Sequence, residues 1–588
     1  MQVASTSGAG DGGNRQLKRW GPIIGVVVVV AIGIVVLIAT RGNDKKAVSP
    51  GTSSAAGGAA TTARAGGNTT PTSGAPATVT FPMSYSEAKS KGIADKVDWG
   101  KRCDTTTGRL AVPDYFAPEC YAPFTGDNGG ATSPGVTADT INLVFYEGIA
   151  NDPIIAYVTD AVKVDDTNAQ LAETMKEIVR YYGAYYELYG RKINLVTYEG
   201  TGITTDEVAA RADAAAIVEK YHPFAVLGGP VLTSAFADEL AKNKTMCIGC
   251  TPGQPAKFYS DRDPYVWGLD GSAAQKQVHV LEFIQKQLIG KNAVHGGDAV
   301  KALPRKFGLV YLESSGASKD LADSFAAGMN TLGAPLAATV PYQLNPQTIQ
   351  QEASQVITKL KSAGVTTVIF SGDPVAPRDF TKEATAQEYF PEWLVAASTL
   401  VDVTAFARTY DQQQWAHAFG VTQLPARNEP TTSGSYGLYK WFTGKEPPAN
   451  DTIGVIAPNP ALFFAVLQYT GPNLTPRAFK DALFKAASTR PGISQPLLSY
   501  GDKGYWGGVP DYQGVDDATA FWWDPKATGP DEIRKQGTGM YQYVDGGKRY
   551  LPTQWATVDK LFDPNGAVSI YTTPPPGEAP GTYPSPAG

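Results

Sequence analysis

Short apolar segments alternate with amphipathic helical patterns along most of this chain. The segments Ile141–Tyr146, Ile193–Tyr198, Phe224–Leu227 and Phe307–Leu312 are dominated by apolar residues. A strand with one face in water would alternate apolar and polar residues, so these strands are expected to be covered on both faces. Strands of this kind, separated by helices, are typical of parallel doubly wound sheets. The sequence therefore predicts an α/β fold.

The helical segments show apolar residues at steps of three and four. After the first strand these residues are Leu171, Met175, Ile178, Tyr182, Tyr185 and Tyr189. We expect that face of the helix, with its tyrosine cluster, to pack in the core and not to form a stacking platform for a ligand. Two later helix starts are predicted from capping residues: a Thr-x-x-Glu capping box at Thr204–Glu207, and Thr475 as N-cap before Pro476.

The strand–helix alternation begins a second time at Phe307, which predicts two α/β lobes. Residues 459–469 predict a buried helix. Ala520–Trp523 and Met540–Tyr550 predict antiparallel strands, the second as a hairpin around Asp545–Gly547. Neighbouring side chains of a strand point to opposite faces, so one of the two rings of Trp522 and Trp523 is expected to point inward and the other outward, in packing roles. These late elements are expected to complete the two lobes.

An apolar segment lies near the N-terminus. Residues Gly21–Thr40 contain no charged side chain and are long enough to cross the ~30 Å hydrocarbon core of a bilayer as a helix. A cleaved signal sequence is the alternative, but this segment is longer than a typical signal core and lacks a small-residue cleavage pattern at its end. We predict a retained signal anchor in the cell membrane, crossed once, with most of the chain extracytoplasmic.

The chain contains four cysteines: Cys103, Cys120, Cys247 and Cys250. An even number of cysteines in a chain with a membrane span is typical of disulfides formed in an oxidising compartment. Among the three possible connectivities we favour Cys103–Cys120 and Cys247–Cys250, which close the shortest loops. A redox or metal motif at Cys247–Cys250 is the alternative. The four histidines are scattered along the chain, so no metal site is predicted.

Composition excludes one class of partner and leaves two segments without a core. The net charge is −6, and no run of Lys and Arg is interleaved with aromatic residues, so no nucleic-acid partner is expected. Residues 42–80 are almost entirely Gly, Ala, Ser, Thr and Pro, and residues 572–588 are rich in proline. Neither segment has enough apolar side chains to offset the entropy lost on ordering.

Several segments follow the order and spacing of a known protein family. They are Tyr189–Ile193 (YGRKI), Val226–Gly229 followed by Thr233 and Ser234, Tyr265–Trp267 with Gln275, and Phe307–Tyr311 with Gly316. Over residues 140–555 this pattern resembles the type I periplasmic solute-binding proteins, specifically the branched-chain amino acid (leucine-binding) branch that serves ABC importers. The resemblance implies two doubly wound α/β lobes joined by a three-stranded hinge, with a small solute held between them.

The resemblance also implies boundaries, with crossings between the lobes near residues 270, 402 and 486. The predicted organisation, in chain order, is a short cytoplasmic tail (1–20), the transmembrane signal anchor (21–40), a disordered linker (41–80), a disulfide-stapled extension (81–136), a first lobe (137–270 and 403–486), a second lobe (271–402 and 487–560) and a proline-rich tail (561–588).

Ligands of open parallel sheets lie beyond the carboxyl ends of the strands, so the loops there hold the candidate contacts. The candidates are Tyr146, Asn151, Thr233, Ser234, Thr251, Gly253, Ser315, Asp373 and Ser398.

The resemblance assigns roles to most of these candidates. It implies that the hydroxyls and amides of Thr233, Ser234, Thr251 and Gly253 hold a ligand carboxylate, and that Ser315, Asp373 and Ser398 surround an amino group. The segment Val395–Thr399 lacks the acid of the family pattern. The expected solute is therefore an amino acid or a related small polar or aromatic compound.

Some candidates have an equally ordinary structural role. Thr233 and Ser234 can cap the helix that follows them, and Asp373 can form a turn. Both roles stay open for these residues.

No motif of nucleophilic, metal-dependent or phosphate-binding catalysis occurs in the sequence. We therefore predict binding without catalysis and without a cofactor. The expected partners are a small-molecule ligand, ABC permease subunits and the membrane, through the N-terminal helix. The alternatives are a membrane-anchored ligand sensor or receptor and, third, a cell-envelope enzyme.

Overall fold

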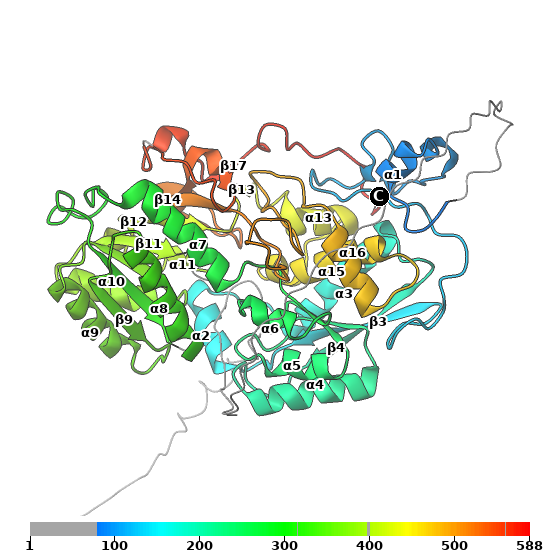
Figure 1. The fold of residues 1–588 in the computed structure, drawn as a ribbon, viewed down its shortest axis with the longest axis horizontal. Coiled ribbons are helices and arrows are strands. Elements are labelled where there is room, and N and C mark those ends of the chain that lie inside the picture. The colour runs from blue at the N-terminus through cyan, green and yellow to red at the C-terminus, as the bar shows by residue number, and fades with distance from the viewer. Residues whose placement is uncertain (1–78, 314–315, 397–399, 559, 588) are drawn as a thin grey trace, which may run out of the picture.

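A computed structural model describes residues 79–313, 316–396, 400–558 and 560–587 (Figure 1). The predicted anchor at residues 21–40, the tail before it and nearly all of the linker after it lie outside the described residues. The folded part forms two α/β lobes, each built around its own sheet.

The first lobe contains a five-stranded sheet with the order β4-β3-β5-β6-β7, in which all neighbours are parallel. Its strands are β3 (Thr140–Glu147), β4 (Lys192–Glu199), β5 (Ala225–Leu227), β6 (Met246–Ile248) and β7 (Val266–Trp267). The central strands β3, β5 and β6 are buried, as the apolar segments predict, whereas β4 lies at the edge and is partly exposed.

Helices cover both faces of this sheet (Figure 1). One face carries α4 (Glu207–Tyr221) and α5 (Ala235–Lys242). The other carries α3 (Asn168–Tyr185) with four helices from much later in the chain: α13 (Gly434–Thr443), α14 (Ile453–Ile456), α15 (Pro458–Thr470) and α16 (Pro476–Lys485). Two further helices of this lobe are α2 (Pro153–Val162) and α6 (Ala256–Ser260).

The stretch Ile453–Thr470 is long and apolar enough to cross a membrane by length and composition, within the part of the chain that the structure describes. Its side chains Phe463, Phe464 and Leu467 are buried in the core of the first lobe, where the sequence predicts a buried helix. It therefore serves as a core helix in this fold.

The helix starts agree with the sequence in part. Thr475 caps α16 by accepting a hydrogen bond from the amide of Ala478, as predicted. The capping box predicted at Thr204 is wrong, because α4 begins at Glu207 and Asp206 accepts the amide hydrogen bonds of its first turn. The Asp206 carboxylate, one residue before the helix, supplies the acceptor that the sequence analysis assigned to the Thr204 hydroxyl. Tyr189 lies beyond the end of α3, in a turn with a positive φ of 54°.

The second lobe contains an eight-stranded sheet with the order β15-β14-β12-β11-β10-β8-β9, in which β16 also pairs with β14. The parallel strands are β8 (Phe307–Leu312), β9 (Ala338–Tyr342), β10 (Thr367–Ser371), β11 (Glu392–Ala396) and β12 (Ala418–Thr422). The antiparallel strands are β14 (Ala518–Pro530), β15 (Gln536–Tyr543) and β16 (Arg549–Tyr550).

Helices again cover both faces. They are α7 (Ala273–Phe283), which continues as a π-helical turn η2 (Ile284–Leu288), α8 (Gly316–Thr331), α9 (Ile349–Ser362), α10 (Ala376–Ala386), α11 (Thr404–Ala407) and α12 (Gln412–Trp415). Two buried clusters lie on opposite faces of the sheet. Helices α9 and α10 pack in one cluster, and helices α7 and α8 pack in the other.

The hairpin predicted around Asp545–Gly547 is wrong. Both β15 and β16 pair with β14, and the turn between paired strands lies at residues 531–535. A short 3-10 turn, η3 (Val544–Gly547), separates β15 from β16. Trp522 and Trp523 belong to different buried clusters on opposite faces of β14, so the ring expected to point outward is also buried.

Two of the predicted lobe boundaries are wrong. Residues 403–486 were assigned to the first lobe, but β12 at Ala418–Thr422 lies within the second sheet, so the second crossing follows it. Residues from 487 were assigned to the second lobe, but Tyr500 and Tyr512 pack in the first-lobe core, so the third crossing lies just before β14.

The N-terminal extension packs on the first lobe and shares its core through Met83, Leu110 and Cys120. It contains α1 (Tyr85–Ser90), the 3-10 turn η1 (Ala94–Lys96), and the short strands β1 (Cys103–Asp104) and β2 (Arg109–Leu110). The disulfides Cys103–Cys120 and Cys247–Cys250 are both present, in the predicted pairing.

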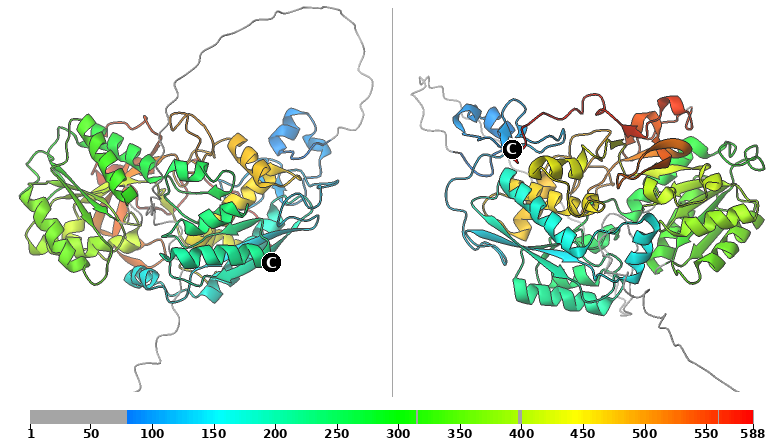
Figure 2. Two further views of the ribbon diagram at one scale, coloured as in Figure 1. Left: turned by 60° about the horizontal axis from the view of Figure 1, so that its bottom comes forward. Right: turned by 180° about the vertical axis from the view of Figure 1, so that it is seen from behind.

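The C-terminal segment is ordered, which corrects the expectation of an unfolded tail. After the turn η4 (Pro564–Gly566), β17 (Ile570–Tyr571) pairs with β13 (Arg427–Asn428). Residues 572–587 then run from the second lobe to the N-terminal extension (Figures 1 and 2). We call this segment the C-terminal strap. The strap has too few apolar side chains to form a core, and hydrogen bonds to the rest of the protein hold it in place.

Candidate functional site

The predicted site residues that the structure describes lie at the carboxyl ends of the parallel strands or in the loops that follow them. Tyr146 lies in the first sheet at the end of β3. Its ring is buried, stacks on Tyr198 and contacts Phe236, and its hydroxyl donates to Asp213 at 3.3 Å. Burial raises the pKa of Tyr146, and the nearby Asp213 raises it further. Tyr146 therefore belongs to a packed network between β3, β4 and α4.

The loop after Tyr146 leads into α2, a helix that the sequence analysis missed. Asn151 is exposed in this loop. The neighbouring Asp152 is buried and caps α2: its Oδ1 accepts from the amides of Ile154 and Ile155, at 2.9 and 3.2 Å. Its Oδ2 accepts from the amide of Thr204 at 2.5 Å, which ties the start of α2 to the loop after β4.

Helix α2 contacts both lobes (Figure 1). On its first-lobe side, Ile155 forms a buried cluster with Val231 and Leu232, from the loop after β5. On its other side, Val158 is buried in the core of the second lobe, in the cluster that includes Phe406 of α11.

A polar contact joins α2 to the second lobe as well. The guanidinium of Arg378, on α10, donates to the hydroxyl of Tyr157 at 2.9 Å and lies 5.5 Å from the centre of its ring. The helix is therefore a physical link between the two halves of the molecule.

The hydroxyls after β5 have different surroundings. Thr233 is buried, and its Oγ1 accepts from the amide of Ala235 at 3.1 Å, at the start of α5. Ser234 is the N-cap residue of α5 and is partly buried, but its side chain makes no capping hydrogen bond. Thr233 thus has the capping role, and the Ser234 hydroxyl remains available to a ligand.

The loop after β6 is closely packed. Thr251 is buried, with its hydroxyl accepting from Gln254 at 3.3 Å and its carbonyl accepting from Tyr259 at 2.8 Å. Gly253 has a φ of 73°, a backbone conformation that disfavours other residues. The Cys247–Cys250 disulfide precedes these residues and fixes the loop to the end of β6.

Asp373 lies at the end of β10 and is fully engaged within the protein. Its Oδ1 accepts from the amides of Val375 and Ala376, and its Oδ2 accepts from the hydroxyl of Tyr342 at 2.5 Å. Burial raises the pKa of Asp373, and these hydrogen bonds oppose that shift. The turn-forming role weighed for this residue is the one that the structure displays. Ser315 and Ser398 lie outside the described residues.

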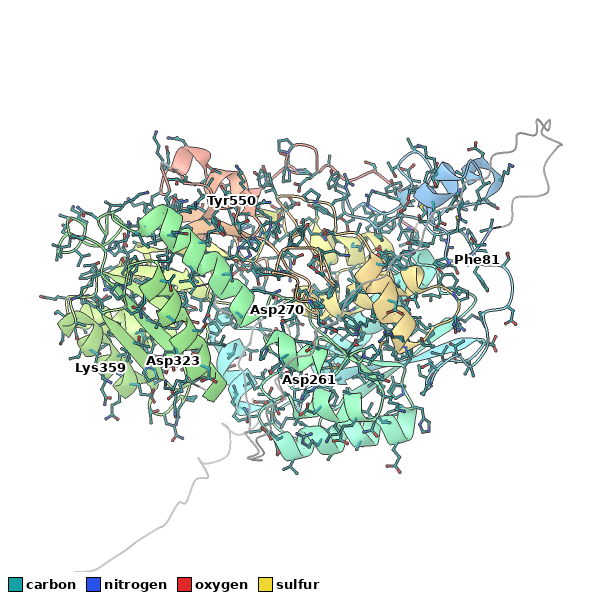
Figure 3. The ribbon with its side chains drawn as sticks, viewed as in Figure 1. Phe81, Asp261, Asp270, Asp323, Lys359 and Tyr550 are labelled. Atoms are coloured by element: carbon teal, nitrogen blue, oxygen red, sulfur yellow. A yellow bond between two sulfur atoms is a disulfide. The ribbon has the colours of Figure 1, made fainter. Side chains whose placement is uncertain are left out.

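Ion pairs connect the lobes beside α2. The turn between β14 and β15, at residues 531–535, reaches the first lobe. Lys535 pairs with Asp451 at 3.2 Å and donates to the carbonyl of Lys163 at 2.7 Å. The guanidinium of Arg534 lies 4.3 Å from the ring centre of Tyr436. At the first crossing between the lobes lies Asp270, which Figure 3 labels. Its carboxylate pairs with Lys276 at 3.4 Å.

Two buried polar side chains at the carboxyl edge of the first sheet were missed. Glu147 ends β3, and Asn459 lies in the first turn of α15; a side-chain oxygen of each is buried without a hydrogen-bond partner. Burial raises the pKa of Glu147 to about 8, and the nearby Glu199 adds to this shift. A charged residue at the end of an apolar strand is the sequence signal that could have identified Glu147.

Within the described ranges, no three His, Cys, Asp or Glu side chains are grouped as metal ligands would be. The polar groups assembled at the strand ends are hydroxyls, amides and carboxyls. Such groups can hold a small solute by hydrogen bonds.

Residues 164–497 match the sequence profile of a family described as periplasmic binding protein. Comparison with curated proteins finds no match to this sequence.

Three solved structures illustrate the structural likeness. A fatty acid ABC transporter substrate-binding protein from Thermomonospora curvata is 14% identical with a TM-score of 0.46, covering 76% of this chain and 100% of its own. A solute-binding protein of an ABC transporter from Rhodopseudomonas palustris, in complex with 3,4-dihydroxybenzoic acid, is 13% identical with a TM-score of 0.48, covering 72% and 98%. A leucine-, isoleucine-, valine-, threonine- and alanine-binding protein from Brucella ovis is 14% identical with a TM-score of 0.48, covering 74% and 100%.

Proposed function

This chain belongs to the periplasmic binding protein family, and from that membership we propose that it is the solute-binding component of an ABC importer. The proposed solute is an amino acid or a related small polar or aromatic compound. The proposed partners are the permease subunits of the importer. The proposed role is capture of the solute, without chemical change, between the two lobes.

One observation supports this proposal: two α/β sheets, one parallel and one mixed, lie in separate lobes that the chain connects by three crossings and one bridging helix. Ligands of parallel sheets lie beyond the carboxyl ends of the strands. In the first lobe those ends carry Ser234, with an unused hydroxyl, and the constrained turn at Gly253. We propose that these residues, with Thr251 and the exposed Asn151, contact the solute from the first lobe.

The second lobe is proposed to contribute through the loops after β8, β10 and β11, which hold Ser315, Asp373 and Ser398. Asp373 would act there mainly by shaping the start of α10, because its carboxylate is already bonded to three donors. Tyr146 would likewise act as a packed support, because its hydroxyl is bonded to Asp213.

The location is proposed to be extracytoplasmic, with the N-terminal helix at residues 21–40 as a retained anchor. Two disulfides support an oxidising compartment. A tether of this kind would keep the binding protein close to a permease in the same membrane.

The experiment starts from the full-length chain purified in detergent. Mass spectrometry of small molecules released by denaturation identifies a co-purified solute. The stripped protein is then tested by thermal shift against a metabolite library. A solute at a hundred times its Kd should stabilise the folded protein by about 2.7 kcal/mol. The absence of both a released solute and any stabilisation at millimolar concentrations would contradict the proposal.

A further inference from the structure

Glu147 carries a carboxyl group that the protein itself does not satisfy. The residue is 3% exposed, and its Oε1 has no hydrogen-bond partner. No ion pair with a Lys, Arg or His is found for it in the described part of the chain. A buried carboxylate without a partner costs several kcal/mol, so this group requires a further partner, such as a water, an ion or a ligand, or must hold a proton.

The strand geometry places this carboxyl at a defined position. Tyr146 points toward α4 and α5, where it contacts Asp213 and Phe236. Successive side chains of a strand alternate between faces, so Glu147 points toward the opposite face, which α3 and α15 cover. It also lies at the carboxyl edge of the sheet, where the proposed solute contacts are.

Two amide side chains on the same face carry further unused oxygens. Asn168, in the first turn of α3, donates from Nδ2 to the carbonyl of Gly148 at 3.0 Å, beside Glu147, and its Oδ1 is buried without a partner. Asn459, in the first turn of α15, also has a buried Oδ1 without a partner.

Asn459 lies over the ends of the two strands that follow β3 across the sheet. A Cβ atom added to Gly249, after β6, would come within 2.1 Å of the Asn459 Oδ1. A Cβ added to Gly228, after β5, would lie 4.0 Å from its Nδ2. Two glycines thus leave room for the Asn459 side chain at the edge where β3 ends.

The other acidic groups at this edge are either exposed to solvent or already hydrogen-bonded within the protein. Glu199 is in register with Glu147 on the neighbouring strand and is exposed to solvent. Asp152 is bonded to three backbone amides, and Asp166 accepts from the amide and the hydroxyl of Thr452, both at 2.7 Å. The unsatisfied groups at this edge are therefore acceptor oxygens, one of them acidic.

We propose that Glu147, with Asn168 and Asn459, forms a subsite that receives a protonated amino group of the solute. An ammonium group offers three donors and a positive charge, which matches a carboxylate and two amide oxygens. The inference rests on the proposed solute-binding function and deepens it, because it places recognition of the amine on the first lobe. The segment Val395–Thr399, where the family pattern has an acid, contains none.

Burial raises the pKa of Glu147 to about 8, so much of the empty protein holds this carboxyl protonated at pH 7. Binding of an ammonium group then displaces a proton from the carboxyl. Affinity for an amine should rise as the pH increases from 6 to 8. Calorimetry in buffers of different ionisation enthalpy measures the released proton directly.

The test compares amines with hydroxyl counterparts of the same shape on the full-length, stripped chain. The probes are L-leucine against 2-hydroxy-4-methylpentanoate, and 2-phenylethylamine against 2-phenylethanol. The identity of the co-purified solute, from mass spectrometry, adds a probe-independent result. We expect a released solute with an amino group and a preference of at least about tenfold for the amine within a pair that binds.

Glu147→Gln should abolish this preference and the proton release, with the protein still folded. Glu173→Gln is the control: this exposed glutamate on α3 should change affinity less than about twofold.

Each outcome separates this inference from the function on which it rests. A bound solute without an amine, or an amine preference retained by the Glu147→Gln variant, overturns the ammonium subsite and leaves the binding function intact. Failure to find any bound solute overturns both.

Discussion

Thr233 and Ser234 are adjacent hydroxyl residues, but only the Ser234 hydroxyl is left without a capping hydrogen bond and can bond to a ligand. The Thr233 hydroxyl accepts an amide hydrogen bond at the start of α5, whereas the Ser234 side chain makes no capping bond. A ligand can therefore use Ser234 without disturbing the helix. The same distinction applies to Asp373, whose two oxygens already accept three hydrogen bonds.

The first prediction concerns Ser234. Ser234→Ala should weaken solute binding about fivefold, because one hydrogen bond contributes roughly 1 kcal/mol, and should leave the melting temperature of the solute-free protein unchanged. Calorimetric titration and a thermal melt of the same preparation measure the two effects. Ser362→Ala, at an exposed position of α9, is the control. A lowered melting temperature with unchanged affinity would assign Ser234 to the helix instead of the ligand.

The second prediction concerns Asp516, a buried carboxyl before β14. Burial raises its pKa to about 7, although Ser499 and Trp506 donate hydrogen bonds to it. Its charged neighbours Asp511 and Asp517 also disfavour ionisation. Because the folded-state pKa lies above the unfolded value, its contribution to stability is full below pH 4 and is lost as the pH rises through about 7.

Asp516→Asn should therefore gain stability relative to the natural protein as the pH rises from 5 to 8, by an amount on the order of a few kcal/mol. Denaturant unfolding at several pH values measures the difference between the two proteins. Asp502→Asn, at an exposed turn nearby, should show no such trend. A constant difference across this range would refute the assignment.

Hydrogen bonding in the folded protein separates residues that the sequence could not. Asp373 and Glu147 both lie buried near the carboxyl end of an apolar strand, yet the first accepts hydrogen bonds from the amides of Val375 and Ala376, whereas Oε1 of the second has no partner. That difference depends on where α10 and α3 begin and on which side of the sheet each carboxyl lies. Neither can be read from one strand and its loop.

Helix α2 is the element that most changes the sequence-based description. Strands β3, β5 and β8 were predicted because buried parallel strands are almost continuous apolar segments. Helix α2 is short, and its two apolar sides contact different lobes, so its pattern does not follow a single helical stripe. The lobe boundaries failed for a related reason, because β12 follows two short helices that interrupt the regular alternation.

The third prediction concerns this bridging helix. Val158→Ala removes apolar contact with the second lobe only, so it should weaken the arrangement of the two lobes seen in this structure by about 1 kcal/mol and lower solute affinity roughly fivefold. The change should appear in affinity more than in the melting temperature. Asp160→Ala, on the exposed side of α2, is the control. Equal losses of stability in both variants, with unchanged affinity, would show that α2 does not couple the lobes to binding.

At the scale of the whole molecule, the C-terminal strap adds a fourth connection to the three crossings. Glu578 is buried, and its carboxylate accepts from the amides of Ile493 and Ser494, at 2.6 and 3.1 Å. Tyr583 donates to Asp104 in the N-terminal extension at 2.9 Å. The strap therefore ties the second lobe to the segment before the third crossing and to the extension on the first lobe.

The fourth prediction follows from these bonds. Glu578→Ala removes a carboxylate that accepts hydrogen bonds from several donors, so it should lower the free energy of unfolding by about 3 kcal/mol and expose the strap to proteolysis. Limited digestion followed by intact-mass analysis locates the cleavage. Thr573→Ala, at an exposed strap position, should leave both properties unchanged. A strap that resists cleavage in the Glu578→Ala variant would contradict this account.

We propose that the two lobes close around a captured solute, the hinge motion that periplasmic binding proteins exemplify. All four native cysteines form disulfides, so spin labels can be attached at introduced cysteines in Lys220→Cys on α4 and Lys359→Cys on α9. Both positions are exposed, and they lie on different lobes. Pulsed electron spin resonance of the full-length chain then measures the distance between them before and after the solute released from the protein is added back. The account predicts a distribution that shifts to shorter distances at saturating solute; a distribution that stays the same while the solute is bound would contradict it.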